Sequence, residues 1–237
     1  MKRVRKTAWL LFLTLGLEAG GLAGDKPSAE LKERVKQAGP GMYRVGDVTV
    51  DAKLGVAAFP AKVNQLVGLI EYALVTEIGK VHESFLSTKA RPSDIHAAML
   101  LLGAKSPRAV TIELGWKVDD KWVRKPMLNF IAQYPLETSS ERNDKVTVKS
   151  FDITSHDWKW TGSHIQNGKI AADLSGSILS LQPDIDALAM VEPMVDTSRF
   201  GSHVWPKRAP ELGQAVQVFI RLKKRASTES GATKGPV

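Results

Sequence analysis

The chain has 237 residues, 43% of them hydrophobic, no cysteine and a formal net charge of +8. The lack of cysteine excludes disulfides, thiolate zinc sites and a thiolate-bound iron–sulfur cluster. The positive charge does not predict a nucleic-acid partner, because residues 1–24 and residues 223–237 each carry a net charge of +3 and residues 25–222 only +2. A protein face that follows phosphates needs its positive charges on the folded body.

Residues 1–24 have the composition of a secretory signal peptide. Four basic residues between Lys2 and Lys6 precede an apolar stretch over 7–17, and small residues follow as far as Gly24. The apolar stretch is too short to span a membrane, which takes roughly 20 residues. We therefore predict cleavage near Gly24, a periplasmic or extracellular protein, and no transmembrane segment in the mature chain.

Residues 25–42 form a lead-in segment in which the sequence predicts a short helix over 28–38, ended by Gly39-Pro40. From Tyr43 the apolar residues alternate with a period of two, which is typical of strands. Such runs occupy residues 43–52, 56–64, 69–77, 109–118, 121–132, 145–153, 156–163, 168–181 and 214–223.

Turn residues join several of these runs. Asp119-Asp120 and Asn167-Gly168 both predict hairpin turns, since Asp, Asn and Gly tolerate positive φ. Pro126 places its strand at a sheet edge or a bulge, because proline cannot donate a ladder hydrogen bond.

Two segments of the body have a helical pattern. One covers 93–103, with Pro92 before it, Ser93 as the predicted N-cap and Gly103 at its end. The other covers 183–192 and begins at Pro183. We therefore predict one mainly β (α+β) domain over residues 43–222, a β-sandwich or open barrel with one buried α-helix, followed by a disordered basic tail at 223–237.

Two histidines raise the question of a site. A divalent metal could be held by His82, His96 and either Glu83 or Asp94, if folding gathers them. Within a strand, the adjacent His82 and Glu83 point to opposite faces, so only a bulge or turn lets both reach one ion. The alternative is that the histidines are ordinary structural residues, which are commonly half-buried.

Three further residues have two interpretations each. Trp158 and Trp160 fall on one face of a strand, where they form either an aromatic platform for a ligand or part of the core. Asp173 lies in an apolar run and either pairs with His82 or Lys80 or faces solvent.

Five motifs in the order GK-x-HES-x-L, P-x-DIHAA-x-LLLG, WTGS, AADLSG-x-I and P-x-LG-x-x-V resemble the YdjY-like domain family of exported bacterial proteins. The resemblance covers residues 45–222 and implies export without naming an activity. The residues of this chain that match the motifs of the family, and that the resemblance marks as candidates for a site, are Gly79, Lys80, His82, Glu83, Ser84, His96, Gly162, Ser163, Ala172, Asp173 and Gly176. Some family members are labelled ferredoxin-like, but a chain without cysteine cannot hold a thiolate-bound cluster.

Common catalytic motifs are missing from the sequence. It has no G-x-S-x-G elbow, no phosphate-binding glycine loop and no dinucleotide fingerprint, so NAD is not expected. The first hypothesis is an exported, non-catalytic binding module for an envelope protein or a small ligand, with its working surface around His82, Glu83 and the 93–103 helix. The alternatives are a metal-dependent hydrolase with His82 and His96 as ligands and Glu83 as general base, and a structural envelope component that pairs through a strand edge.

Overall fold

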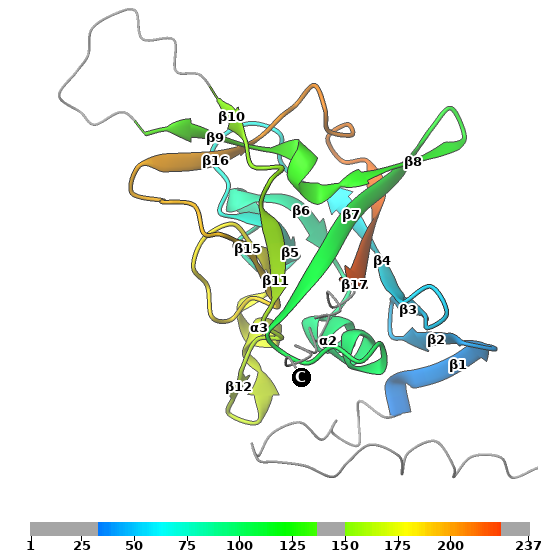
Figure 1. Ribbon diagram of the computed structural model, residues 1–237. Coiled ribbons are helices and arrows are strands. Elements are labelled where there is room, and N and C mark those ends of the chain that lie inside the picture. The colour runs from blue at the N-terminus through cyan, green and yellow to red at the C-terminus, as the bar shows by residue number, and fades with distance from the viewer. Residues whose placement is uncertain (1–32, 137–149, 224–237) are drawn as a thin grey trace, which may run out of the picture.

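The computed structural model describes residues 33–136 and 150–223 (Figure 1). Eight strands form a closed barrel. Around the barrel they are β4 (Val56–Val63), β17 (Ala215–Leu222), β7 (Arg108–Val118), β11 (Asp157–Trp160), β15 (Ala189–Glu192), β14 (Ser177–Ser180), β5 (Tyr72–Thr76) and β6 (Ser84–Thr88), which pairs back to β4. The mainly β fold is confirmed, and the barrel is closed.

The strands overlap very unequally around the barrel. The β17 strand pairs with β4 over seven residue pairs, from Ala215↔Lys62 to Arg221↔Val56. The closing pair of strands, β4 and β6, meets only at Lys62↔Ser87 and Val63↔Leu86. The first half of β4 pairs on that same edge with β3 (Val48–Asp51) instead. The barrel is therefore closed by a short seam.

Further strands extend the barrel sheet at two places. A meander of β1 (Val35–Gly39), β2 (Met42–Val45) and β3 continues outward from β4, and β8 (Lys121–Pro126) pairs with β7. The helix predicted over 28–38 is wrong from Val35 onward, because those residues pair with β2. Hydrogen bonds between strands overrode a weak local helix preference. Residues 1–32, and with them the predicted signal peptide, lie outside the described residues, as do residues 224–237 of the tail.

The two predicted hairpin turns are confirmed. Asp119 and Asp120, between β7 and β8, have φ of 49° and 60°. Asn167 and Gly168 have φ of 52° and 75° and join β12 (Ile165–Gln166) to β13 (Lys169–Ile170). Among the described strands β8 pairs only with β7, so Pro126 does end an edge strand, as predicted.

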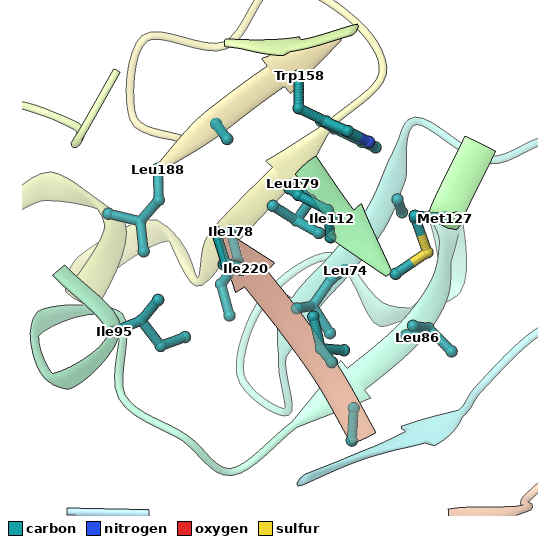
Figure 2. Close-up of a cluster of buried hydrophobic side chains, with 14 of the residues drawn as sticks. Leu74, Leu86, Ile95, Ile112, Met127, Trp158, Ile178, Leu179, Leu188 and Ile220 are labelled. Carbon is teal, nitrogen blue, oxygen red and sulfur yellow. The ribbon is translucent and has the colours of Figure 1, made fainter. Parts of the chain in front are cut away.

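The helix α2 (Pro92–Leu101) closes one end of the barrel, and Gly103 follows it with φ of 81°. Ile95 is fully buried and faces the same apolar cluster as Leu74 and Ile220 of the barrel wall (Figure 2). The predicted N-cap was wrong by two residues: Arg91 is the N-cap, and the backbone N–H of Ser93 donates instead to Oδ1 of Asp173 at 2.8 Å.

Three other predictions about secondary structure were also wrong. The strand predicted over 121–132 is interrupted after Pro126 by the 3-10 helix η2 (Met127–Phe130). The helix predicted over 183–192 is a turn followed by β15, which pairs with β14 and β11. The strand predicted over 168–181 is interrupted by the short helix α3 (Ala171–Ser175), which ends at Gly176 with φ of 77°. Asp173 belongs to α3, and its bond to Ser93 joins the two helices.

The other end of the barrel carries a second sheet (Figure 1). Its strands are β10 (Phe151–Asp152), β9 (Ile131–Pro135) and β16 (Phe200–Val204), and a bridge between Ile70 and Ser202 ties it to the start of β5. Of the strand predicted over 145–153, residues 145–149 lie outside the described residues. No helix in the described ranges is long and apolar enough to cross a membrane.

Candidate functional site

The segment around His82 is a 3-10 turn, η1 (Val81–Glu83), between the crossover from β5 and the start of β6. This turn brings Nε2 of His82 to 3.3 Å from Oε1 of Glu83, which a continuous strand would not have done. The His82 side chain is 74% exposed. The pair is therefore a surface feature.

Glu83 also belongs to a charge cluster centred on Lys80. The ammonium of Lys80 lies 2.9 Å from Oε2 of Glu71 and 3.5 Å from Oε2 of Glu83, and Gln182 donates to Oε2 of Glu71 at 2.6 Å. Partial burial would raise the pKa of Glu71, but hydrogen bonds with Lys80, Glu83 and Gln182, together with the positive charge of Lys80, outweigh burial and lower that pKa. The hydrogen bond to Glu71 in turn raises the pKa of Lys80.

Ser84 has a structural role in this segment. Its hydroxyl is buried and donates to the carbonyl oxygen of Lys80 at 2.6 Å. The amide of Asn64 donates to the carbonyl oxygens of Val81 and Ser84. These bonds fix the path of the crossover. The hydrogen of the Ser84 hydroxyl is already donated to the backbone and is not offered to a ligand.

His96 lies at the opposite end of β6 from His82. The 3-10 turn precedes Ser84, the first residue of β6, whereas α2 begins after Thr88, its last. From Ser84 to Thr88 the strand makes four steps of about 3.3 Å, so its two ends are roughly 13 Å apart. The His96 ring stacks on Trp160 at a centroid distance of 6.2 Å. The structure therefore does not gather the two histidines.

The remaining predicted site residues are used within the fold. Both carboxylate oxygens of Asp94 accept hydrogen bonds from Arg34, and Asp94 is 1% exposed. The hydroxyl of Ser163 accepts a hydrogen bond from the backbone N–H of Ala172 in the first turn of α3. In the described part of the chain, no group of three or more His, Cys, Asp or Glu side chains is placed to hold a metal ion.

The two tryptophans predicted on one face do share it, and both are buried. Trp158 is 3% exposed and Trp160 1%. Neither presents a flat exposed face, so the interpretation as core residues fits the structure. Trp158 nevertheless borders a pocket on the barrel wall, which the sequence did not indicate.

This wall pocket has a volume of about 500 Å³ and lies over residues 110–113 of β7. On one edge of β7 the β11 pairing ends at Trp158↔Val110, and the β8 pairing begins only at Pro126↔Glu113. Among the described strands, nothing pairs with Thr111 and Ile112 on that edge. The opposite edge continues unbroken along β17. The pocket therefore sits at a gap in the barrel wall.

The lining of the wall pocket combines apolar and polar groups. Its apolar surface consists of Val110, Ile112, Pro126, Leu128 and Trp158. Its charged groups come from β7, β8, β11 and β17 and are Glu113, Arg124, Asp157 and Arg221. Arg124 is held in place by Glu113 at 2.7 Å and by the ring of Phe219 at 3.8 Å from its centroid.

Two residues that line the wall pocket each have a buried polar atom without a hydrogen-bond partner. Nε1 of Trp158 and Nδ1 of His156 are both buried, and neither bonds to any of the described residues. An unsatisfied buried donor costs about 1–3 kcal/mol. An indole N–H can only donate, so Trp158 needs an acceptor that these residues do not supply.

This pocket was not predicted from the sequence, because its residues are far apart along the chain. His156, Arg221 and Arg124 come from three segments and form no local motif. The nearest signal in the sequence was Pro126, which predicted an edge or a bulge for its strand and which lies where the β8 pairing begins. Comparison of the chain with family models, curated proteins and solved structures found no match.

Proposed function

We propose that this protein is an exported, non-catalytic binding domain that takes a small ligand in the wall pocket. The observation that supports this proposal best is the unsatisfied Trp158 donor beside a concave surface at a gap in the barrel wall. Small-ligand sites typically have volumes of about 300–1,000 Å³ and a mostly apolar lining with a few polar groups that orient the ligand. The volume of the wall pocket lies in this range, and its lining combines five apolar residues with polar and charged ones.

The carboxylates of the pocket favour binding over catalysis, and the unpartnered imidazole nitrogen there, Nδ1 of His156, is buried. Glu113 is engaged by Arg124, and Asp157 is engaged by Lys223. A general base has to be free to take a proton in reach of a substrate. The hydrolase alternative would use His82 and His96 together, and these lie at opposite ends of β6.

The test is a thermal-shift screen of the purified protein against small organic acids, amides, amino acids and monosaccharides. A ligand of the pocket should raise the melting temperature, because binding to the folded state stabilises it. Trp158→Phe should abolish or weaken that rise, since it removes the indole donor and keeps an aromatic ring.

Trp122→Phe is the matched control, because Trp122 is an exposed indole on β8. It should leave the melting-temperature rise intact. If no compound stabilises the protein, or if both variants respond like the unmodified chain, the wall pocket is not the ligand site.

A further inference from the structure

We propose that the ligand of the wall pocket is a small monocarboxylic acid with an apolar body, and that Arg221 holds its carboxylate. This inference rests on the proposed function above, and it adds the chemical class of the ligand and the residue that selects it. Three features of the pocket carry it: its charge balance, its spare hydrogen-bond donors and its apolar surface.

The charges of the pocket leave one cation without a counter-ion. Glu113 is paired with Arg124, and Asp157 is paired with Lys223. Arg221 is half-buried, lies opposite Thr111 on β17, and makes no hydrogen bond or ion pair with the side chains of the described residues. A partly desolvated guanidinium favours an anion, and the carboxylate matches its planar fork of donors. A ligand with a single negative charge would balance the positive charge of Arg221.

The spare hydrogen-bonding capacity is also that of a donor site. Arg221 and the indole N–H of Trp158 offer only donors, while Nδ1 of His156 donates or accepts depending on its tautomer. The carboxylates of the pocket already accept bonds from cations. A ligand rich in acceptors therefore complements the pocket, whereas an amine or ammonium ligand would face Arg221 with a like charge.

The rest of the lining asks for an apolar body. Pro126 lines the pocket and is exposed, whereas Val110, Ile112 and Leu128 are at most 5% exposed. A hydrocarbon portion placed against Pro126 leaves water, which is favourable in proportion to the area covered. A small, fully polar anion such as formate would not use this surface.

The inference is tested by isothermal titration with two matched pairs of compounds: phenylacetate with phenylacetamide, and hexanoate with hexanamide. Each pair keeps the apolar body and changes only the charge of the head group. The carboxylates should bind about tenfold more tightly than the amides, or better, because a hydrogen bond to a charged group is stronger than one to a neutral group. Arg221→Gln should remove this preference, and Arg221→Lys should retain part of it.

Arg199→Gln is the control, because Arg199 is an exposed guanidinium before β16 and does not line the wall pocket. It should keep the full preference for the carboxylate. Circular dichroism of each variant checks that it is folded, and the lysine variant serves if the glutamine variant does not fold.

The possible outcomes separate the two proposals. If acids and amides bind equally well and Arg221→Gln changes neither, the pocket remains a ligand site and the carboxylate assignment is wrong. If amides bind more tightly than acids, the assignment is also wrong. If neither class binds and the broader screen also finds no ligand, the proposed function itself fails.

Discussion

The carboxylate of Asp94 in the first turn of α2 accepts two hydrogen bonds from the guanidinium of Arg34, at 2.8 Å from Nε and 2.5 Å from the terminal nitrogen. Asp94 is almost completely buried, whereas the Arg34 side chain is 31% exposed. This fork-to-fork pair fastens the segment before β1 to the helix that closes the barrel. It also occupies the carboxylate that the sequence suggested as a metal ligand.

Arg34→Gln should therefore destabilise the protein by about 2 kcal/mol, because it leaves a buried carboxylate without its charged partner. The measurement is urea unfolding followed by circular dichroism at pH 7. Lys36→Gln removes an exposed cation two residues away and should change the free energy of unfolding by less than about 0.5 kcal/mol. Equal effects of the two substitutions would show that the pair contributes nothing specific.

Gly46→Ala should destabilise the protein for two reasons. Gly46 has φ of 56°, where an L side chain is strained, and an added Cβ would collide with the Asp94 carboxylate. We expect a loss of about 2–3 kcal/mol. Gly55→Ala is a close control, because Gly55 has φ of 64° and open space around it, so only the backbone strain of about 1 kcal/mol applies. A Gly46 variant no less stable than the Gly55 variant would exclude the collision.

His203 should make the protein less stable in mild acid. Burial lowers the pKa of His203 below its ordinary value of 6.5. The ring packs against Tyr134 and Trp205, and its Nε2 lies 3.4 Å from the Ser150 hydroxyl. Below about pH 6.5 the unfolded chain takes up a proton that the folded protein resists, so the free energy of unfolding falls until the pH reaches the folded pKa.

The check is urea unfolding at several pH values between 8 and 5. His203→Gln should have a shallower loss of stability over that range than the unmodified protein. A His203 variant with an unchanged slope would mean that burial of this ring does not penalise its protonation.

Lys80→Met should raise the pKa of Glu71, since it removes the hydrogen bond and the positive charge that now lower it. The shift is measurable by NMR titration of the side-chain carboxyl carbon. Both side chains are more than a third exposed, so solvent screening keeps the stability loss to about 0–1 kcal/mol. A Glu71 pKa that stays lowered in the variant would assign the effect to Glu83 and Gln182 instead.

Local signals in the sequence predicted those parts of the fold that local chemistry decides. Asp119, Asp120 and Asn167 adopt positive φ because their short polar side chains permit it. Gly168 and Gly103 adopt positive φ because glycine has no Cβ. The helix α3 was missed because its residues also fit an alternating pattern. Its Asp173 accepts a hydrogen bond from Ser93, 80 residues away, which no local pattern reports.

The candidate site was harder to predict, for the same physical reason. His82 and His96 are close in sequence, but a whole strand runs between them and carries them to opposite ends of the barrel. Arg221 and Trp158 border one pocket because β17 and β11 both pair with β7, and register over such distances depends on the whole sheet.

The short seam between β4 and β6 has a consequence for how the barrel comes apart. Only two rungs need to separate there, whereas separating β17 from β4 breaks seven. The β14–β15 pairing also has only two residue pairs. Local opening follows the route that breaks the fewest interactions, so the ring should part at one of these two short pairings well before the molecule unfolds. Each opening would bare two strand edges able to pair with those of a neighbouring molecule. Under mild destabilisation the protein should therefore exchange strands between copies, and form dimers, through one of these short pairings in its wall.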